Sequence, residues 1–348
     1  MDSFMPSPIP YQYTGYGSRS WLLVTFLYSS YPYELYPGWD KLRSLNTLFR
    51  KKSTHFAGNL PVLIALTINL GVPPLLFVQV LYGHLFYSSA VTQAVPWILV
   101  IPALILAYYG SYIFVKNSGK HPAWSMTGLI ASSVLLLYIG FMYVSNSTMT
   151  INPAAMQAHL ENPGGMNLNL GDRSLWPRYL HFIVAALAVA NLGIAVYASF
   201  SFRDNPGEKE AVIKNGLKNF AWFTLAQFIF GTLFWLTTPR EVWMTFMGGN
   251  MVATILMVLS LLIIISMIVM AFRGKLWGTV WHALLVIIIM AVMREFMRFA
   301  YLDGIFKPSQ LEKVNQYSPF ILFLVVFVAG LFLLYYMIRL ATDKNNKS

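Results

Sequence analysis

The feature that most constrains this chain is a series of eight stretches, each of about 20 or more mostly apolar residues. A helix needs about 20 apolar residues to cross the hydrocarbon core of a bilayer, and lipid offers no partner to an unpaired backbone N–H or C=O group. We therefore predict an all-α, polytopic membrane helix bundle of eight transmembrane helices, in contact with a lipid bilayer. The predicted spans are about 60–86, 94–115, 123–146, 179–202, 217–238, 248–272, 277–301 and 318–340.

Composition excludes several classes of protein. Hydrophobic residues make up 57% of the 348 positions and charged residues only 11%, against about 25% charged residues in an average soluble domain. These values exclude a soluble globular enzyme, a disordered chain and a fibrous protein. The chain has no cysteine, which excludes disulfides, thiolate zinc sites, iron–sulfur clusters and covalent attachment of c-type haem.

The basic residues predict the orientation of the bundle. The formal net charge is +11, from 24 Lys and Arg against 13 Asp and Glu. With eight spans and a cytoplasmic N-terminus, seven of the 24 basic residues fall outside and the other 17 inside, in agreement with the positive-inside rule. The outer seven are Arg173, Arg178, Arg240, Arg294, Arg298, Lys307 and Lys313. We therefore expect both termini in the cytoplasm, and the charge reflects topology, with no nucleic-acid partner.

Three regions follow from these spans. Residues 1–59 are predicted to be a cytoplasmic or interfacial segment, because the aromatic stretch 21–37 is short and interrupted by prolines. Residues 60–342 form the predicted eight-helix transmembrane domain, and residues 343–348 form a cytoplasmic tail. The longest outer loop, 147–178, is rich in Asn, Gly and Pro and is predicted to form a small periplasmic cap.

Ionisable side chains within the predicted spans are few. Glu295 is the only acidic residue in a span, and no histidine lies near a membrane midplane, which disfavours a proton-coupled transporter or pump. His84 and His181 lie at outer span ends, with arginines and methionines at similar depth. Haem b requires an imidazole, an apolar slot and cations for its propionates. The residues alone leave two interpretations open: a haem b site at the outer face, or interfacial side chains that anchor helix ends at the headgroups.

A family resemblance bears on this choice. Residues 171–203 read GDRSLWPRYLHFIVAALAVANLGIAVYASFSFR, in which Tyr179 and His181 precede the small-residue run 185–190. This pattern resembles the helix of cytochrome bd quinol oxidase subunit I that carries the low-spin haem b histidine. Three shorter stretches resemble other parts of that subunit; they are residues 68–89 with Gln79, residues 135–153, and residues 243–251 (WMTFMGGNM).

The resemblance implies a haem b held between His181 and Met247, with His84 as the alternative to Met247 for the sixth ligand position. Arg178 and Arg240 lie at similar depth and are the candidate propionate partners. The family's high-spin haem histidine helix, its long quinol-binding loop and its Gly-Arg-Gln-Pro-Trp motif have no counterpart in this chain. The resemblance therefore implies the low-spin haem site without oxygen reduction.

These observations lead to an expected function. The chain is predicted to be a b-type-cytochrome-like subunit of a respiratory complex in a bacterial inner membrane. It would pass electrons between the quinone pool and a periplasmic partner, with other complex subunits that include a c-type cytochrome. For the quinone headgroup, Trp281 with His282 and Glu295 with Arg298 are candidate positions, or simple interfacial anchors. Two alternatives stay open: a cofactor-free membrane anchor or scaffold of a redox complex, and a small-solute channel or carrier.

Overall fold

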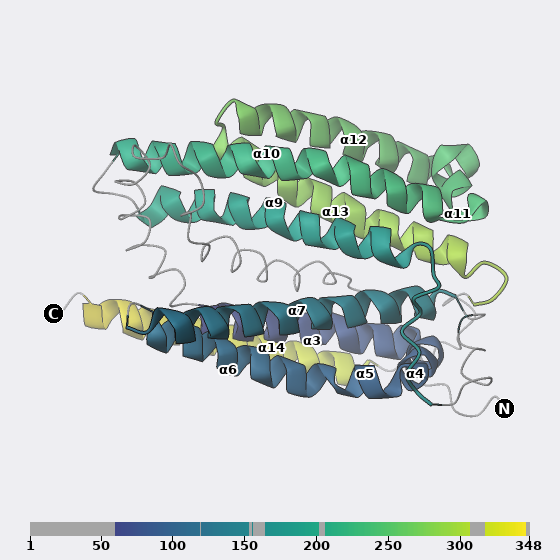
Figure 1. Cartoon of the computed structure of the whole chain (residues 1–348), viewed down its shortest axis with the longest axis horizontal. Helices are drawn as coiled ribbons and strands as arrows, with labels where there is room; N and C mark the ends of the chain where they lie inside the picture. The colour runs from purple at the N-terminus through teal and green to yellow at the C-terminus, as the bar shows by residue number, and fades with distance from the viewer. Residues whose placement is uncertain are drawn as a thin grey trace. The chain divides into compact units, whose positions relative to one another are not determined.

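The computed structural model describes residues 60–118, 120–152, 155, 164–201, 206–306 and 317–345 (Figure 1). Regular structure in these residues is entirely helical. The helices are α3 (Leu60–Leu81), α4 (Gly83–Thr92), α5 (Ala94–Ile98), α6 (Val100–Asn117), α7 (Pro122–Thr150), α9 (Leu175–Ser201), α10 (Pro206–Thr237), α11 (Arg240–Met244), η1 (Thr245–Gly249), α12 (Met251–Phe272), α13 (Leu276–Tyr301) and α14 (Ser318–Asn345). The predicted segment 1–59 lies outside the described residues.

Eight helical segments among the described residues are long and apolar enough to cross a membrane. They are Leu60–Leu81, Ala94–Asn117, Ala123–Thr150, Leu175–Phe200, Lys209–Thr237, Met251–Phe272, Leu276–Tyr301 and Phe320–Met337. Each overlaps one predicted span, so the prediction of an all-α chain is confirmed, with eight helices long and apolar enough to span a membrane.

The described helices fall into two compact units, α3 to α13 in one and α14 in the other. In the first unit, α6 packs along α7, α9 along α10 and α12 along α13, and α10 also packs on α12. A buried apolar cluster joins α9, α10, α12 and α13, and many of its members are small. Examples are Ala188, Ala195, Ala221, Ala271 and Ala283. Small side chains let helix backbones approach closely where lipid supplies no hydrophobic driving force between helices.

Helix α14 is apolar and its described side chains are exposed along its length. Phe323 and Phe327 stack one turn apart, with ring centroids separated by 5.7 Å. An apolar helix with so little of its own surface covered is suited to lipid contact.

The first predicted span is two helices. The backbone leaves helical geometry at Tyr82 (φ −125°, ψ 29°), and α4 then continues from Gly83 to Thr92, beyond the predicted end at 86. Tyr82 is buried at the break, where its ring meets the edge of the Phe306 ring at 5.9 Å between centroids. This aromatic contact places α4 against the segment that follows α13.

Helix α10 begins earlier than predicted. The charged connection between the predicted spans 179–202 and 217–238 is expected from its mixed charges to be a solvated loop, but from Pro206 onward it is helical. Proline suits the first helical position, because the N–H group it lacks has no partner inside the helix there. The charged residues therefore extend a membrane helix beyond the bilayer instead of forming a loop.

The predicted loop 147–178 is shorter at both ends, since α7 continues to Thr150 and α9 begins at Leu175. Its described part is bound to α7: the Ser145 hydroxyl donates to the Leu168 carbonyl at 2.7 Å. Just before α9, the Asp172 carboxylate accepts hydrogen bonds from the Ser174 N–H at 2.8 Å and the Ser174 hydroxyl at 2.7 Å. These bonds fix the start of α9, which carries two of the predicted site residues.

Candidate cofactor site

Helix α9 presents Arg178 and His181 on one face, because residues three apart in an α-helix are neighbours on its surface. The same face meets α10. The Arg178 guanidinium carbon lies 4.8 Å from the centre of the Phe234 ring. A Cβ atom added at Gly231, one turn earlier on α10, would lie 3.5 Å from both Nδ1 and Cε1 of His181. The structure thus brings the two predicted residues together against one stretch of α10.

His181 has a ring nitrogen without a partner. Its Nδ1 atom is buried and forms no hydrogen bond with any described residue. The backbone carbonyl of Gln227 lies near the ring, but not in hydrogen-bond geometry with Nδ1. Because Gly231 has no side chain, α10 places no side-chain atom of that residue against this edge of the imidazole.

Arg178 has an open edge of the same kind. Its Nε and Nη2 atoms are buried and lack hydrogen-bond partners among the described residues. These two nitrogens form the side of a guanidinium that binds a carboxylate with two parallel hydrogen bonds. A buried cation whose donors are left unused is costly. The arrangement therefore fits an anionic group that carries a carboxylate.

The other surroundings of Arg178 come from α13 and from the end of α10. The Tyr301 hydroxyl lies within hydrogen-bonding reach of Arg178 and of Thr238. The Thr238 hydroxyl in turn donates to the Phe234 carbonyl at 2.9 Å. Asp172 contributes charge attraction from the segment before α9. Tyr301, Thr238 and Phe234 therefore position the guanidinium, and sequence reasoning did not identify them.

His84 lies on a different element. It is exposed on α4, and its ring packs edge-on against Phe306 with 4.5 Å between centroids. Both predicted histidines thus lie near the end of α13: His181 is one turn from Arg178, which contacts Tyr301, and His84 contacts Phe306.

Met247 and Arg240 belong to the segment between α10 and α12. Met247 lies in η1 with non-helical backbone angles (φ −105°, ψ 37°), and its side chain is 57% exposed. Arg240 is exposed at the first position of α11. The structure therefore does not bury either side chain with Arg178 and His181.

At the two predicted quinone positions Trp281 is exposed, while the polar side chains are engaged with protein groups. His282 Nδ1 donates to the Gly278 carbonyl at 2.8 Å, and Nε2 lies 3.3 Å from the Ser266 hydroxyl on α12. Arg298 Nη1 lies 3.0 Å from both carboxylate oxygens of Glu295, and its guanidinium lies 4.7 Å from the centre of the Tyr82 ring. At both positions these contacts join neighbouring parts of the bundle.

Comparison with known proteins gives no assignment. No family model matches the chain, and no similar curated protein or solved structure is found. The functional proposal therefore depends on the residues of this chain alone.

Proposed function

We propose that this chain is a multi-pass membrane subunit that binds haem b at its outer face and passes electrons within a respiratory complex of a bacterial inner membrane. The observation that carries the proposal is the pair of buried, unpartnered polar groups on α9: Nδ1 of His181, and Nε with Nη2 of Arg178. An axial imidazole and a cation for a propionate are two of the features that a haem b site requires, beside an apolar slot. Here they are one helical turn apart.

Haem b would supply one-electron redox chemistry to a chain that has no cysteine-borne redox centre. His181 would be the axial ligand and Arg178 the propionate partner. Met247 is the proposed second axial ligand, with His84 as its alternative, and Arg240 is the second propionate candidate. The exposure of Met247 in this structure leaves His181 and Arg178 as the pair that the geometry favours.

The remaining parts of the proposal follow from the distribution of charge and from the family resemblance. Both termini would be cytoplasmic, and the outer end of α9 would face the periplasm, where a c-type cytochrome partner could exchange electrons with the haem. The quinone pool would be the other partner that exchanges electrons with the haem.

The experiment is an absorption measurement on the full chain, purified from a haem-sufficient bacterial host. Wild type should show a reduced b-type band and a positive pyridine haemochrome assay, and His181→Ala should lose both. His121→Ala is the matched control, because His121 is exposed at the start of α7 and its loss should leave the band unchanged. Met247→Leu and His84→Ala identify the second ligand by a change in the low-spin spectrum.

The alternative of a cofactor-free scaffold has a different outcome in the same experiment. A wild-type chain that folds and stays monodisperse without haem would favour the scaffold and reject the proposal. Retention of the full b-type band by His181→Ala would reject His181 as the ligand.

A further inference from the structure

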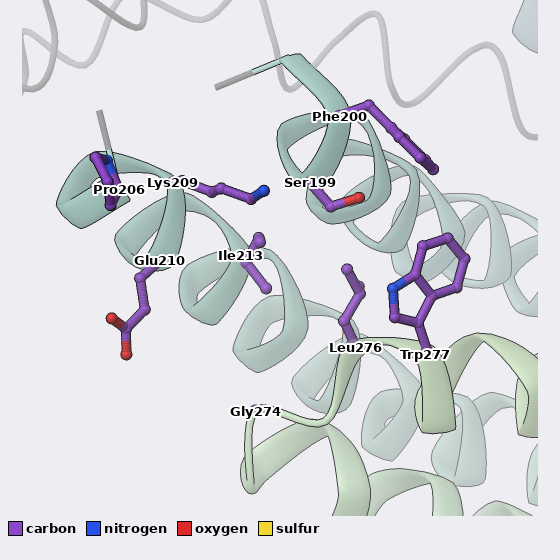
Figure 2. Close-up of a pocket in the computed structure, with 9 residues that line it drawn as sticks. All are labelled: Ser199, Phe200, Pro206, Lys209, Glu210, Ile213, Gly274, Leu276 and Trp277. Carbon is purple, nitrogen blue, oxygen red and sulfur yellow. The ribbon is translucent and has the colours of Figure 1, made fainter. Parts of the chain in front are cut away.

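At the opposite end of α9 the structure contains a pocket of about 500 Å³ that the proposed function does not use. It lies between the end of α9, the start of α10 and the turn that joins α12 to α13 (Figure 2). Its lining residues are Ser199, Phe200, Pro206, Lys209, Glu210, Ile213, Gly274, Leu276 and Trp277.

The depth of the pocket is set by the ends of the candidate spans. One span ends at Phe200, another begins at Lys209, a third ends at Phe272 and a fourth begins at Leu276. The lining residues lie at these boundaries or within about one helical turn of them. The pocket therefore lies where the hydrocarbon core gives way to the phosphate layer of the headgroups.

The polar groups of the pocket favour an anion. In Figure 2 the Lys209 side chain extends across the pocket toward Ser199, and the Glu210 carboxylate is directed away from it. Lys209 forms no ion pair with a described residue. The Ser199 hydroxyl donates to the Val196 carbonyl at 2.7 Å, so the donors that remain for a ligand are the Lys209 ammonium group and the Trp277 indole N–H.

Two further features near the pocket also favour a negatively charged ligand. The pocket opens at the first turn of α10, a helix of 32 residues, and a helix N-terminus favours negative charge. Arg273 and Lys275 are exposed on either side of Gly274 in the turn that lines the pocket. Together with Lys209 these make three basic residues near the pocket against two acidic ones at the start of α10, Glu208 and Glu210, so the net charge favours an anion from the membrane surface.

The remaining wall is apolar. The Phe200 and Trp277 rings form a T-shaped pair with 5.9 Å between centroids, and Ile213 and Leu276 face the same space. A ligand that matches this lining has an anionic group at the donors and a hydrocarbon part beside the aromatic rings. We propose that this pocket binds the headgroup phosphate of an anionic phospholipid, with Lys209 and Trp277 as its donors.

The test measures lipid retention by native mass spectrometry on the full chain in mild detergent, titrated with phosphatidylglycerol or phosphatidylcholine. Wild type should retain a phosphatidylglycerol molecule in preference to phosphatidylcholine. Lys209→Gln should weaken that retention about fivefold, the usual value of one lysine at an anionic surface, and Trp277→Phe should weaken it through the lost N–H. Lys214→Gln changes an exposed lysine of α10 outside the lining and should behave as wild type.

Several results would reject the proposal. Equal retention by wild type, Lys209→Gln and Trp277→Phe would show that neither residue holds the lipid. Equal retention of the two lipids would remove the selectivity for an anionic headgroup. Displacement of phosphatidylglycerol by millimolar inorganic phosphate, in wild type but not in Lys209→Gln, would assign the pocket to the free ion instead of a lipid.

Discussion

Arg178 is a buried cation with two polar atoms that lack a hydrogen-bond partner among the described residues. Removing a cation from water costs several kcal/mol unless hydrogen bonds and opposite charge replace the solvent. The face of the Phe234 ring and the Tyr301 hydroxyl replace part of it, and a planar guanidinium can use both at once. The Nε–Nη2 edge receives nothing from the described residues. The residue is thus stabilised on one side and left open on the side where a ligand carboxylate would bind.

Removal of the Tyr301 hydroxyl tests this description without touching the open edge. Tyr301→Phe should lower the free energy of unfolding by about 1–3 kcal/mol, because a hydroxyl within reach of a buried cation is lost where water does not replace it. Tyr109→Phe is the control, since Tyr109 is 64% exposed, and it should change stability by less than about 0.5 kcal/mol. Denaturant unfolding in detergent micelles measures both. Equal stability of the two variants would contradict the role given to Tyr301.

Gly231 provides a second test at the same scale. A Cβ atom at this position would lie at an ordinary contact distance, 3.5 Å, from the His181 ring, so Gly231→Ala should be tolerated. Gly231→Leu extends into the space beside Nδ1 and should abolish the b-type absorption band expected under the proposed function. Gly193→Leu, at a glycine of α9 with no atom within 4 Å of an added Cβ, should keep the band. Survival of the band in Gly231→Leu would exclude Nδ1 of His181 as the side that faces the cofactor.

Sequence reasoning found only part of this site, for a physical reason. Arg178 and His181 share a face by spacing alone, so their proximity could be predicted. Gly231 and Phe234 could not be assigned to them, because a helix that is apolar nearly all round does not show which face meets its neighbour. Tyr301 and Thr238 are ordinary residues at helix ends, and only the packing of α13 beside α9 gives them a role.

At the scale of the helical element, α6 and α7 show how close two membrane helices can approach. A Cβ atom at Gly128 would lie 2.6 Å from the Gly110 carbonyl oxygen, and one at Gly110 would lie 2.5 Å from the Ser132 hydroxyl oxygen. The Ser132 hydroxyl donates to the Ala107 carbonyl across the same contact at 2.7 Å. Two glycines and one serine thus permit direct backbone contact and an interhelical hydrogen bond.

Gly128→Ala should therefore separate the two helices and lower the free energy of unfolding by about 1–3 kcal/mol. Gly193→Ala is the matched control: it lies inside a membrane helix with open space around an added Cβ. Because alanine is the better helix former, that control should be neutral or slightly stabilising. Thermal unfolding of both variants in one detergent is the measurement. A neutral Gly128→Ala would mean that α6 and α7 are not in the close contact described.

Helix boundaries show where hydropathy ceases to be informative. The apolar core of every span could be predicted from the requirement that lipid-exposed backbone be helical. The charged first turns of α10 could not, since a solvated loop and a helix that extends into water have the same composition there, and only Pro206 marks the start. The break at Tyr82 also depends on a distant ring, Phe306, which hydropathy does not detect.

At the scale of the whole molecule, the orientation in the membrane rests on charge alone. The helices fix the number of candidate spans, while the side that each connection faces follows from the asymmetry of the lysines and arginines. The haem proposal depends on this orientation, because only a site at the outer face could exchange electrons with a periplasmic cytochrome. The pocket at Lys209 would then lie at the cytoplasmic leaflet.

The absence of cysteine makes the orientation directly measurable, because a single introduced cysteine is the only thiol in the chain. Met166 is 63% exposed in the connection between α7 and α9, and Lys120 is exposed between α6 and α7. In intact spheroplasts, a membrane-impermeant maleimide should label Met166→Cys, and it should label Lys120→Cys only after the membrane is permeabilised. The unmodified chain is the blank. The reverse pattern would place the outer end of α9 in the cytoplasm, and electron exchange at Arg178 and His181 would then need a cytoplasmic partner.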